Sequence, residues 1–299
     1  MSGAARPVVL VCAVEAPERS LPGVSAAHWL ARELGAQLHL VHVFDPMSIP
    51  VPRSGEVSAL GRSSDDIAAA ARTWAEERLA RAAWLVEDVS PEASVLDGPI
   101  VEELVRYAGE RRASLVITTT AARGPVDRLL VGSVSAQLAA RAPCPVLAVA
   151  RDAVTGGPGP VVCAYDGSDH GARAARHAAW LAAALGRELV LAHVRSLHDH
   201  VPALADDELR AAAAVHGPGV RVIVRDGDPG EELARLATTC DAAVVVAGTR
   251  GRGPVASALL GSVAATLVRS AGRPVVLVPA TAGGPEGSGG VVDAGRPVG

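Results

Sequence analysis

Short, continuous apolar runs recur along the chain, and each is followed by a longer stretch rich in alanine, leucine and charged residues. Uninterrupted apolar runs are typical of parallel strands that are covered on both faces. The stretches between them carry Arg and Glu on their outer side, which predicts amphipathic helices. Strands are expected at residues 8–14, 37–44, 93–96, 115–119, 146–150, 161–165, 189–194, 221–225, 243–248 and 275–279. The alternation predicts a doubly wound α/β fold with right-handed crossovers.

The order of these elements repeats, so the chain reads as two copies of one unit. Trp29 in the first predicted helix matches Trp180, and Gly132-Ser133 matches Gly261-Ser262. Self-similarity of this kind indicates duplicated structural units. Each copy is predicted to contain five strands separated by helices.

We place the first domain, half one, at residues 1–151 and the second, half two, at residues 159–281. A segment rich in glycine and proline links them. Residues 282–299 are also rich in these residues and have little to bury, which predicts a disordered tail.

The two copies differ between their second and third strands. Half one has a long predicted helix over residues 65–86, whereas half two has only a short one over residues 203–215. The long helix contains Trp74 and Trp84. We interpret both as packing residues, with a partner surface as the alternative.

Composition limits the classes of function. The 299 residues suffice for two domains, and a formal charge of −4 gives no reason to propose a nucleic-acid or membrane-surface partner. No apolar run approaches the roughly 20 residues of a membrane span. The four cysteines lack metal-binding spacing, and no disulfide framework or signal peptide is recognisable, so a cytoplasmic location is expected.

A glycine-rich loop follows the apolar run that ends half two's fourth predicted strand. It contains Gly248, Gly251 and Gly253, and a predicted helix opens at Gly261-Ser262. Glycines allow positive φ and close approach of a ligand to the backbone, while free N–H groups at a helix start attract anions. Ser262 is expected to be the N-cap of this helix. The loop therefore predicts a phosphate site, although a Walker loop is excluded because the chain has no lysine.

Three signatures in half two together resemble the universal stress protein family. They are Asp166-Gly167-Ser168 after the first strand, His193-Val194 at the end of the second, and the spacing Gly248-x2-Gly251-x9-Gly261-Ser262. With the duplication, the chain is similar to a tandem of two such domains. The resemblance implies two Rossmann-like, adenine-nucleotide-hydrolase-like sheets with strand order 3-2-1-4-5. Ligands in such sheets bind where the order reverses, between strands 1 and 4.

The resemblance also implies binding of ATP or a related adenine nucleotide, with or without magnesium, and bound rather than turned over. It places Asp166 beside the nucleoside and Val194 beside the adenine. The phosphates would lie against the loop and the helix start, with Arg250 adding charge at the rim. These residues are Ala247, Gly248, Arg250, Gly251, Gly253, Gly261, Ser262 and Val263. No residue is assigned to catalysis or to a metal, since His198-Asp199-His200 is interpreted as surface loop.

Half one departs from this pattern. Glu15 replaces Asp166, Thr119 replaces Gly248, and Ala122 replaces Gly251. If these glycines required positive φ, each replacement would cost roughly 1–2 kcal/mol. Half one is therefore expected to bind nucleotide weakly or not at all.

Three functions remain open at this point. The first is a stress-response protein that senses or stores adenine nucleotide and passes its state to an unidentified protein partner. The alternative is a member of the same family that binds no nucleotide and acts purely as a protein-interaction module; a nucleotide hydrolase or transferase ranks third.

The apolar strands at residues 146–149 and 275–278 are predicted to pair antiparallel, joining the halves as an intramolecular pseudo-dimer, and further homodimerisation stays open.

Overall fold

The computed structural model describes residues 7–15, 17–45, 64–120, 133–196, 204–251 and 260–284. In half one the elements are β1 (Val9–Ala13), α1 (Pro17–Leu34), β2 (Gln37–Phe44), α3 (Ser64–Trp84), the short 3-10 turn η2 (Glu87–Val89), β3 (Glu92–Asp97), α4 (Ile100–Glu110), β4 (Leu115–Thr120), α6 (Ser133–Arg141) and β5 (Val146–Ala150). In half two they are β6 (Val161–Ala164), α7 (Asp169–Ala184), β7 (Leu189–Arg195), α8 (Asp206–Ala214), β8 (Arg221–Asp226), α9 (Pro229–Thr239), β9 (Val244–Gly248), α10 (Ser262–Ser270) and β10 (Val275–Val278).

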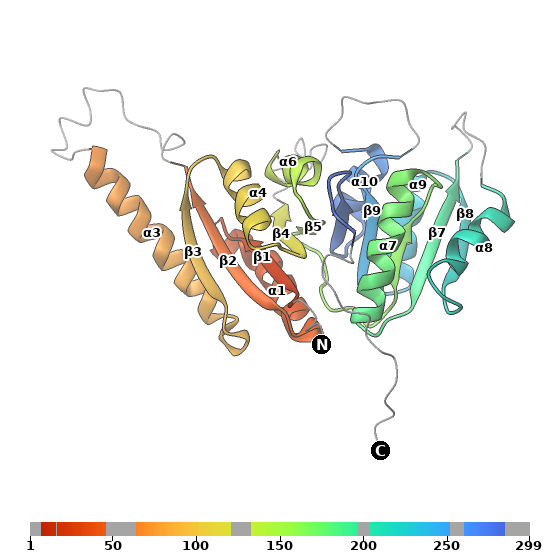
Figure 1. Ribbon diagram of the computed structural model, residues 1–299, viewed down its shortest axis with the longest axis horizontal. Helices are drawn as coiled ribbons and strands as arrows, with labels where there is room; N and C mark the ends of the chain where they lie inside the picture. The colour runs from red at the N-terminus through yellow and green to blue at the C-terminus, as the bar shows by residue number, and fades with distance from the viewer. Residues whose placement is uncertain are drawn as a thin grey trace, which may run out of the picture.

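All ten strands belong to one sheet, in the order β3-β2-β1-β4-β5-β10-β9-β6-β7-β8. Within each half the strands are parallel and follow the order 3-2-1-4-5, which confirms the predicted fold class. At the centre β5 and β10 pair antiparallel, with Leu147 opposite Val276. Figure 1 shows the consequence: the two halves lie side by side, and β3 and β8 form the outer edges. The predicted pseudo-dimer is therefore a single continuous sheet.

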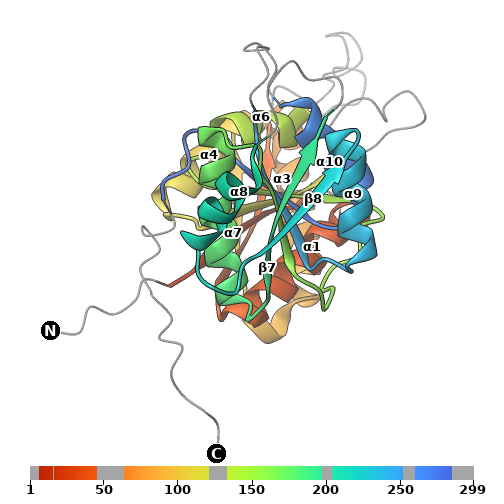
Figure 2. The ribbon, with the colours of Figure 1, turned by 90° about the vertical axis from the view of Figure 1, so that its right-hand side faces the viewer.

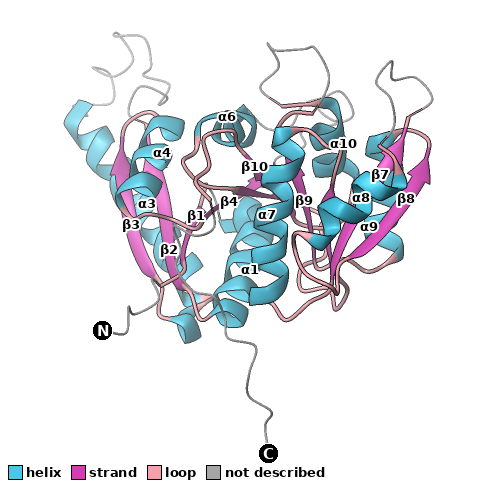
Figure 3. Ribbon diagram, turned by 45° about the vertical axis from the view of Figure 1, so that its right-hand side comes forward, coloured by secondary structure: helices cyan, strands magenta, loops and turns pink. Residues whose placement is uncertain are grey.

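Helices cover both faces of this sheet. Around half two's outer strands, α7 and α8 lie on one side and α9 and α10 on the other (Figure 2). One apolar cluster joins buried residues of α1 and α3 with those of α7, so the core on this face runs through both halves. Figure 3 shows α1 and α7 near the middle of the molecule and the long α3 at its outer end. The core side chains are mostly Val, Leu and Ala, as the low aromatic content requires.

Two reciprocal contacts tie the halves together beyond the strand pair. The N–H of Val154, in the linker, donates to the Gly272 carbonyl at 2.9 Å, and the N–H of Gly283 donates to the Pro143 carbonyl at 3.4 Å. We predicted a disordered tail from residue 282, but Ala282 is buried and Gly283 makes this bond. These first residues belong to the packed structure because they cross onto half one. Residues 285–299 lie outside the described chain.

Among the described helices, none combines the length and the apolar character that a membrane crossing requires.

Candidate functional site

The first wall of the predicted site is the turn between β6 and α7. Oδ1 of Asp166 accepts hydrogen bonds from the N–H of Ser168 at 3.0 Å and from its hydroxyl at 2.6 Å. The Ser168 hydroxyl in turn accepts from the N–H of Gly171 and is the N-cap of α7. Gly171 must be small because a Cβ there would lie 2.5 Å from Asp166 Oδ1. The carboxylate is therefore held in one orientation by the helix start, and Ser168, not Asp166, caps the helix.

The second wall is the loop that follows β9. A Cβ added to Gly251 would lie 2.7 Å from Oδ2 of Asp166, and one added to Gly248 would lie 3.0 Å from the Cβ of His170. The backbone after β9 thus lies directly against the end of β6 and the start of α7. Two segments far apart in sequence meet where the strand order reverses, as the predicted topology requires.

These loop glycines are needed for close approach rather than for left-handed backbone. Gly167 has φ +77°, whereas Gly248, Gly251 and Gly261 are not among the glycines with positive φ. The expected φ penalty for losing them is therefore wrong. The physical cost of a side chain at Gly248 or Gly251 is instead a clash with His170 or Asp166.

The start of α10 forms the third side of the loop. The N–H of Gly261 donates to the Thr249 carbonyl at 2.8 Å, and Gly261 is the N-cap, with no side chain to bond the first turn. Ser262 is the exposed first residue of the helix, so its predicted role as N-cap is wrong. The first-turn N–H groups have no side-chain cap, which leaves this helix end suited to an anion.

The remaining predicted residues lie around this centre. Ala247 is buried one residue before the end of β9, and Arg250 is exposed. Val194 lies near the end of β7, one strand away from β6, and packs with Val263 against a common apolar cluster. Gly253 lies outside the described residues, as does His198-Asp199-His200. The structure thus brings Asp166, Gly248 and Gly251 into one place.

Two histidines recur at equivalent positions and bond to backbone. Nδ1 of His193 lies 2.9 Å from the Tyr165 carbonyl, and Nδ1 of His42 lies 2.6 Å from the Val14 carbonyl. Each ring therefore links the second strand of its half to the chain that leaves the first. Burial lowers the pKa of His42, which favours the neutral ring. This geometry agrees with the structural role predicted for both.

His170 is a residue that the sequence analysis missed. It lies in the first turn of α7, and its Nδ1 is buried without a hydrogen-bond partner among the described residues. Its backbone and Cβ press against Gly248. No sequence motif predicts this contact, because it joins a helix start to a strand end from a distant part of the chain.

Half one is closed at the equivalent place. Oγ1 of Thr119, at the position of Gly248, accepts from the N–H of Gly23 at 3.0 Å and donates to the Ser20 carbonyl at 3.4 Å. The Glu15 carboxylate is turned outward to Arg19, and Arg78 of α3 donates to the Glu15 carbonyl. Ala122 and Gly132 lie outside the described residues. Side-chain and helix atoms thus occupy the end of β4 that is bare backbone in half two.

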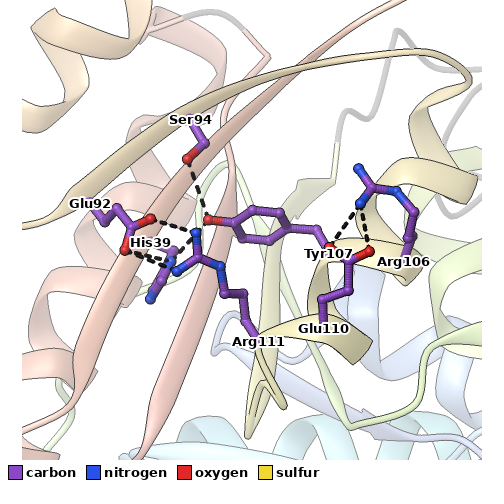
Figure 4. Close-up of polar contacts among 7 residues, drawn as sticks. All are labelled: His39, Glu92, Ser94, Arg106, Tyr107, Glu110 and Arg111. Carbon is purple, nitrogen blue, oxygen red and sulfur yellow. Dashed lines mark hydrogen bonds and ion pairs between the residues drawn. The ribbon is translucent and has the colours of Figure 1, made fainter.

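A second polar cluster lies at the other end of the strands in half one. Figure 4 shows the Tyr107 hydroxyl between Nδ1 of His39 and the hydroxyl of Ser94, at 3.0 and 3.3 Å. Arg111 bridges this group by bonding Glu92, the first residue of β3. Burial lowers the pKa of His39, which favours the neutral ring. The cluster ties the edge strand β3 to α4, and we assign it to stability.

The fold defines a class: a tandem pair of Rossmann-like α/β domains joined through their last strands, with glycine backbone at the strand-order reversal of half two. The sequence profile of the universal stress protein family matches residues 9–150, 159–209 and 195–279. The chain therefore belongs to the universal stress protein family.

Relatives of known sequence and structure agree with this assignment. A universal stress protein of Mycobacterium tuberculosis is 33% identical over 196 residues, which is 59% of this chain and 65% of that protein. The match thus spans less than two thirds of that relative. One from Mycolicibacterium smegmatis is 26% identical over 85% of this chain and 92% of its own length. The crystal structure of a universal stress protein from Archaeoglobus fulgidus aligns with 91% of this chain and 96% of its own, with 21% identity and a TM-score of 0.69, and so supports the fold.

Proposed function

We propose that half two binds ATP or a related adenine nucleotide, with or without magnesium, in the crevice between β6 and β9. The observation that carries this proposal is the approach of Gly251 to Asp166, where a Cβ would lie 2.7 Å from the carboxylate. A bare-backbone loop held against a carboxylate at a strand-order reversal suits a ligand with a polar sugar and phosphates. The residue types present fit such a group.

The roles of the individual residues follow from their positions. Asp166 would lie beside the nucleoside, with Oδ1 bonded to Ser168 and Oδ2 facing the loop. The backbone of Gly248 and Gly251 and the uncapped first turn of α10 would hold the phosphates. Val194 would lie by the adenine. Arg250, exposed at the rim, would add positive charge.

The proposed biological role is a cytoplasmic, stress-responsive regulator whose occupied state is passed to a protein partner. We propose that the nucleotide is bound rather than hydrolysed. Among the described residues around the crevice, Asp166 is tied to the helix start through Ser168, which leaves it poorly placed as a general base. Sustained phosphate release above a buffer blank would contradict this role.

Calorimetric titration of ATP tests the binding site. Val in place of Gly251 would push its side chain into Asp166, so Gly251→Val should weaken ATP binding by about 100-fold, close to 3 kcal/mol. The matched control is Ala122→Val, at the equivalent position of half one, and should change affinity by less than about twofold. Equal binding by wild type and Gly251→Val, or no binding by either, would remove the proposal.

The second candidate function, a pure protein-interaction module, is favoured by one observation. Trp84 and Trp74 of α3 are 71% and 50% exposed, in a chain with few aromatic residues. Tryptophan is enriched among the residues that dominate protein interfaces. If the ATP titrations fail, this surface becomes the leading candidate for the functional contact.

A further inference from the structure

A hollow of about 480 Å³ lies on half one, away from the glycine loop of half two. It runs between α1 and the residues that follow α3. Its floor is apolar: Val24 and Val86 are almost fully buried, and Trp29 is half-buried. Leu21 and Leu85 line it and remain 43% and 44% exposed. The volume falls within the range typical of small-molecule sites.

The polar end of the hollow carries charges of both signs. Nε2 of His28 lies 2.7 Å from Oδ1 of Asp88, and Arg32 lies 3.6 Å from the other oxygen of the same carboxylate. Glu33 is exposed beside them. A ligand with full negative charge would meet Glu33, with Asp88 behind His28 and Arg32, and one with full positive charge would meet Arg32. The balance favours an uncharged ligand with a polar group at one end.

Half two does not repeat this lining. At the positions equivalent to Leu21, His28 and Arg32, its first helix has Ala172, Ala179 and Ala183. Leu85 and Val86 follow α3, the helix that is much longer in half one. The larger side chains around the hollow are therefore a feature of half one, and they are not required by the fold that both halves share.

One lining residue of the hollow, Trp29, also contacts the connection between the halves. The edge of Trp29 that carries Cδ1 and Nε1 faces Gly156 of the linker, where an added Cβ would lie 3.4 Å away. A molecule seated against Trp29 would therefore share a residue with the segment that leads into half two.

We propose that this hollow is a binding site for small, uncharged aromatic molecules, which pack on Trp29 between Leu21 and Leu85 with a polar group toward His28 and Asp88. The site stands whether or not half two binds ATP, because the two share no lining residue described above.

Two matched fluorescent probes test the class of ligand. N-phenyl-1-naphthylamine is uncharged, and 8-anilinonaphthalene-1-sulfonate has the same ring system with one added sulfonate. The full-length protein should give a saturable fluorescence increase with the uncharged probe and bind the sulfonate at least about tenfold more weakly. Tighter binding of the sulfonate, or no saturable signal from the uncharged probe, would overturn the proposal.

Substitutions locate the probe. Ser25 is exposed and lines the hollow, so Ser25→Phe should fill it and weaken binding of the uncharged probe by about tenfold or more. Arg176→Phe, at the equivalent exposed position of half two, should leave it within about twofold. Leu85→Glu is a second variant, and its charge at the rim should also weaken binding. Unchanged binding in both half-one variants, or displacement of the probe by ATP, would place the probe elsewhere and refute the site.

Discussion

The ends of β9 and β4 occupy equivalent places in the two halves and are built in opposite ways. In half two Gly248 ends the strand, and Ala174 stands at the matching position of the first helix. In half one the pair is inverted: Thr119 stands near the strand end and Gly23 in the helix, with the Thr119 hydroxyl bonded to the Gly23 N–H. The side chain has moved from the helix to the strand.

This inversion shows what the glycine after the strand is for. Both arrangements fill the space between helix and strand, so both fold. The arrangement with Gly248 leaves the strand end without a side chain, and in half two the backbone that follows reaches a carboxylate, at Gly251. This pair of positions decides the packing of helix on strand, and the proposed access of a ligand would depend on the same pair.

The largest expected effect comes from replacing Gly248 of half two with threonine, the residue at the equivalent position of half one. Gly248→Thr would place a branched side chain where a Cβ alone would lie 3.0 Å from His170, so ATP binding should fall by at least about 100-fold. Isothermal titration calorimetry with ATP measures this loss of affinity. The reverse change, Thr119→Gly, should create no ATP site, because Glu15 still faces Arg19. A Gly248→Thr protein that binds ATP normally would show that the strand end does not control access.

A second prediction concerns His177 of α7, whose equivalent in half one is the buried Ala26. Burial lowers the pKa of His177 from 6.5 to about 4. Between these two pH values the unfolded chain binds more protons than the folded protein. The stability that depends on the neutral His177 ring is therefore complete above about pH 6.5 and is lost as the pH falls toward 4. The loss should reach about 3 kcal/mol at most.

Urea unfolding at a series of pH values measures this loss. His177→Ala, which copies half one, should flatten the acid side of the profile. The other buried histidines with lowered pKa, His39 and His42, should keep part of the slope. An unchanged profile in His177→Ala would show that this ring is not the dominant acid-sensitive group.

The third prediction tests the packing of Gly23 against Thr119 directly. Gly23→Ala would place a Cβ 2.5 Å from Oγ1 of Thr119 and should cost about 1–3 kcal/mol of unfolding free energy. In the Thr119→Gly background the same change restores the arrangement of half two and should cost little. A double-mutant cycle by chemical denaturation should therefore give a coupling above about 1 kcal/mol. Additive effects would mean that the two positions do not share space.

The smallest expected effect concerns the polar cluster around His39 and Tyr107, which half two lacks. Its positions for His39 and Tyr107 hold Val190 and Leu236. Tyr107→Phe removes the hydroxyl between His39 and Ser94 and should lower the unfolding free energy by about 1–2 kcal/mol, because the buried His39 and the partly buried Ser94 each lose a bond. Leu236→Ala is a cavity control for the equivalent place and should cost about 2–4 kcal/mol. A neutral Tyr107→Phe would show that the hydroxyl does not stabilise β3.

Much of the fold follows from patterns along the chain. Apolar runs predicted all ten strands to within about two residues, and the repeated Trp and Gly-Ser positions predicted two units with one topology. The pairing of β5 with β10 followed from two apolar last strands that each needed a neighbour. These features depend on periodicity and burial, which a sequence displays directly.

The details of the site depend on contacts between distant segments and were less predictable. That Gly251 is small because of Asp166, or that Thr119 bonds Gly23, cannot be inferred without the packing of helix on strand. The choice of Gly261 over Ser262 as N-cap was missed because both residue types favour that position. The nucleotide roles of Asp166 and the loop remain predictions that the titrations will decide.

The covalent joining of the two units through one chain has a consequence for how they can change. In a symmetric homodimer any substitution occurs in both subunits, so a residue that closes one crevice closes the other. Here the central strands keep the geometry of such a dimer, yet each half has its own codons. The two copies can therefore differ, and they do: half one has threonine where half two has glycine, and its helix after the second strand is longer.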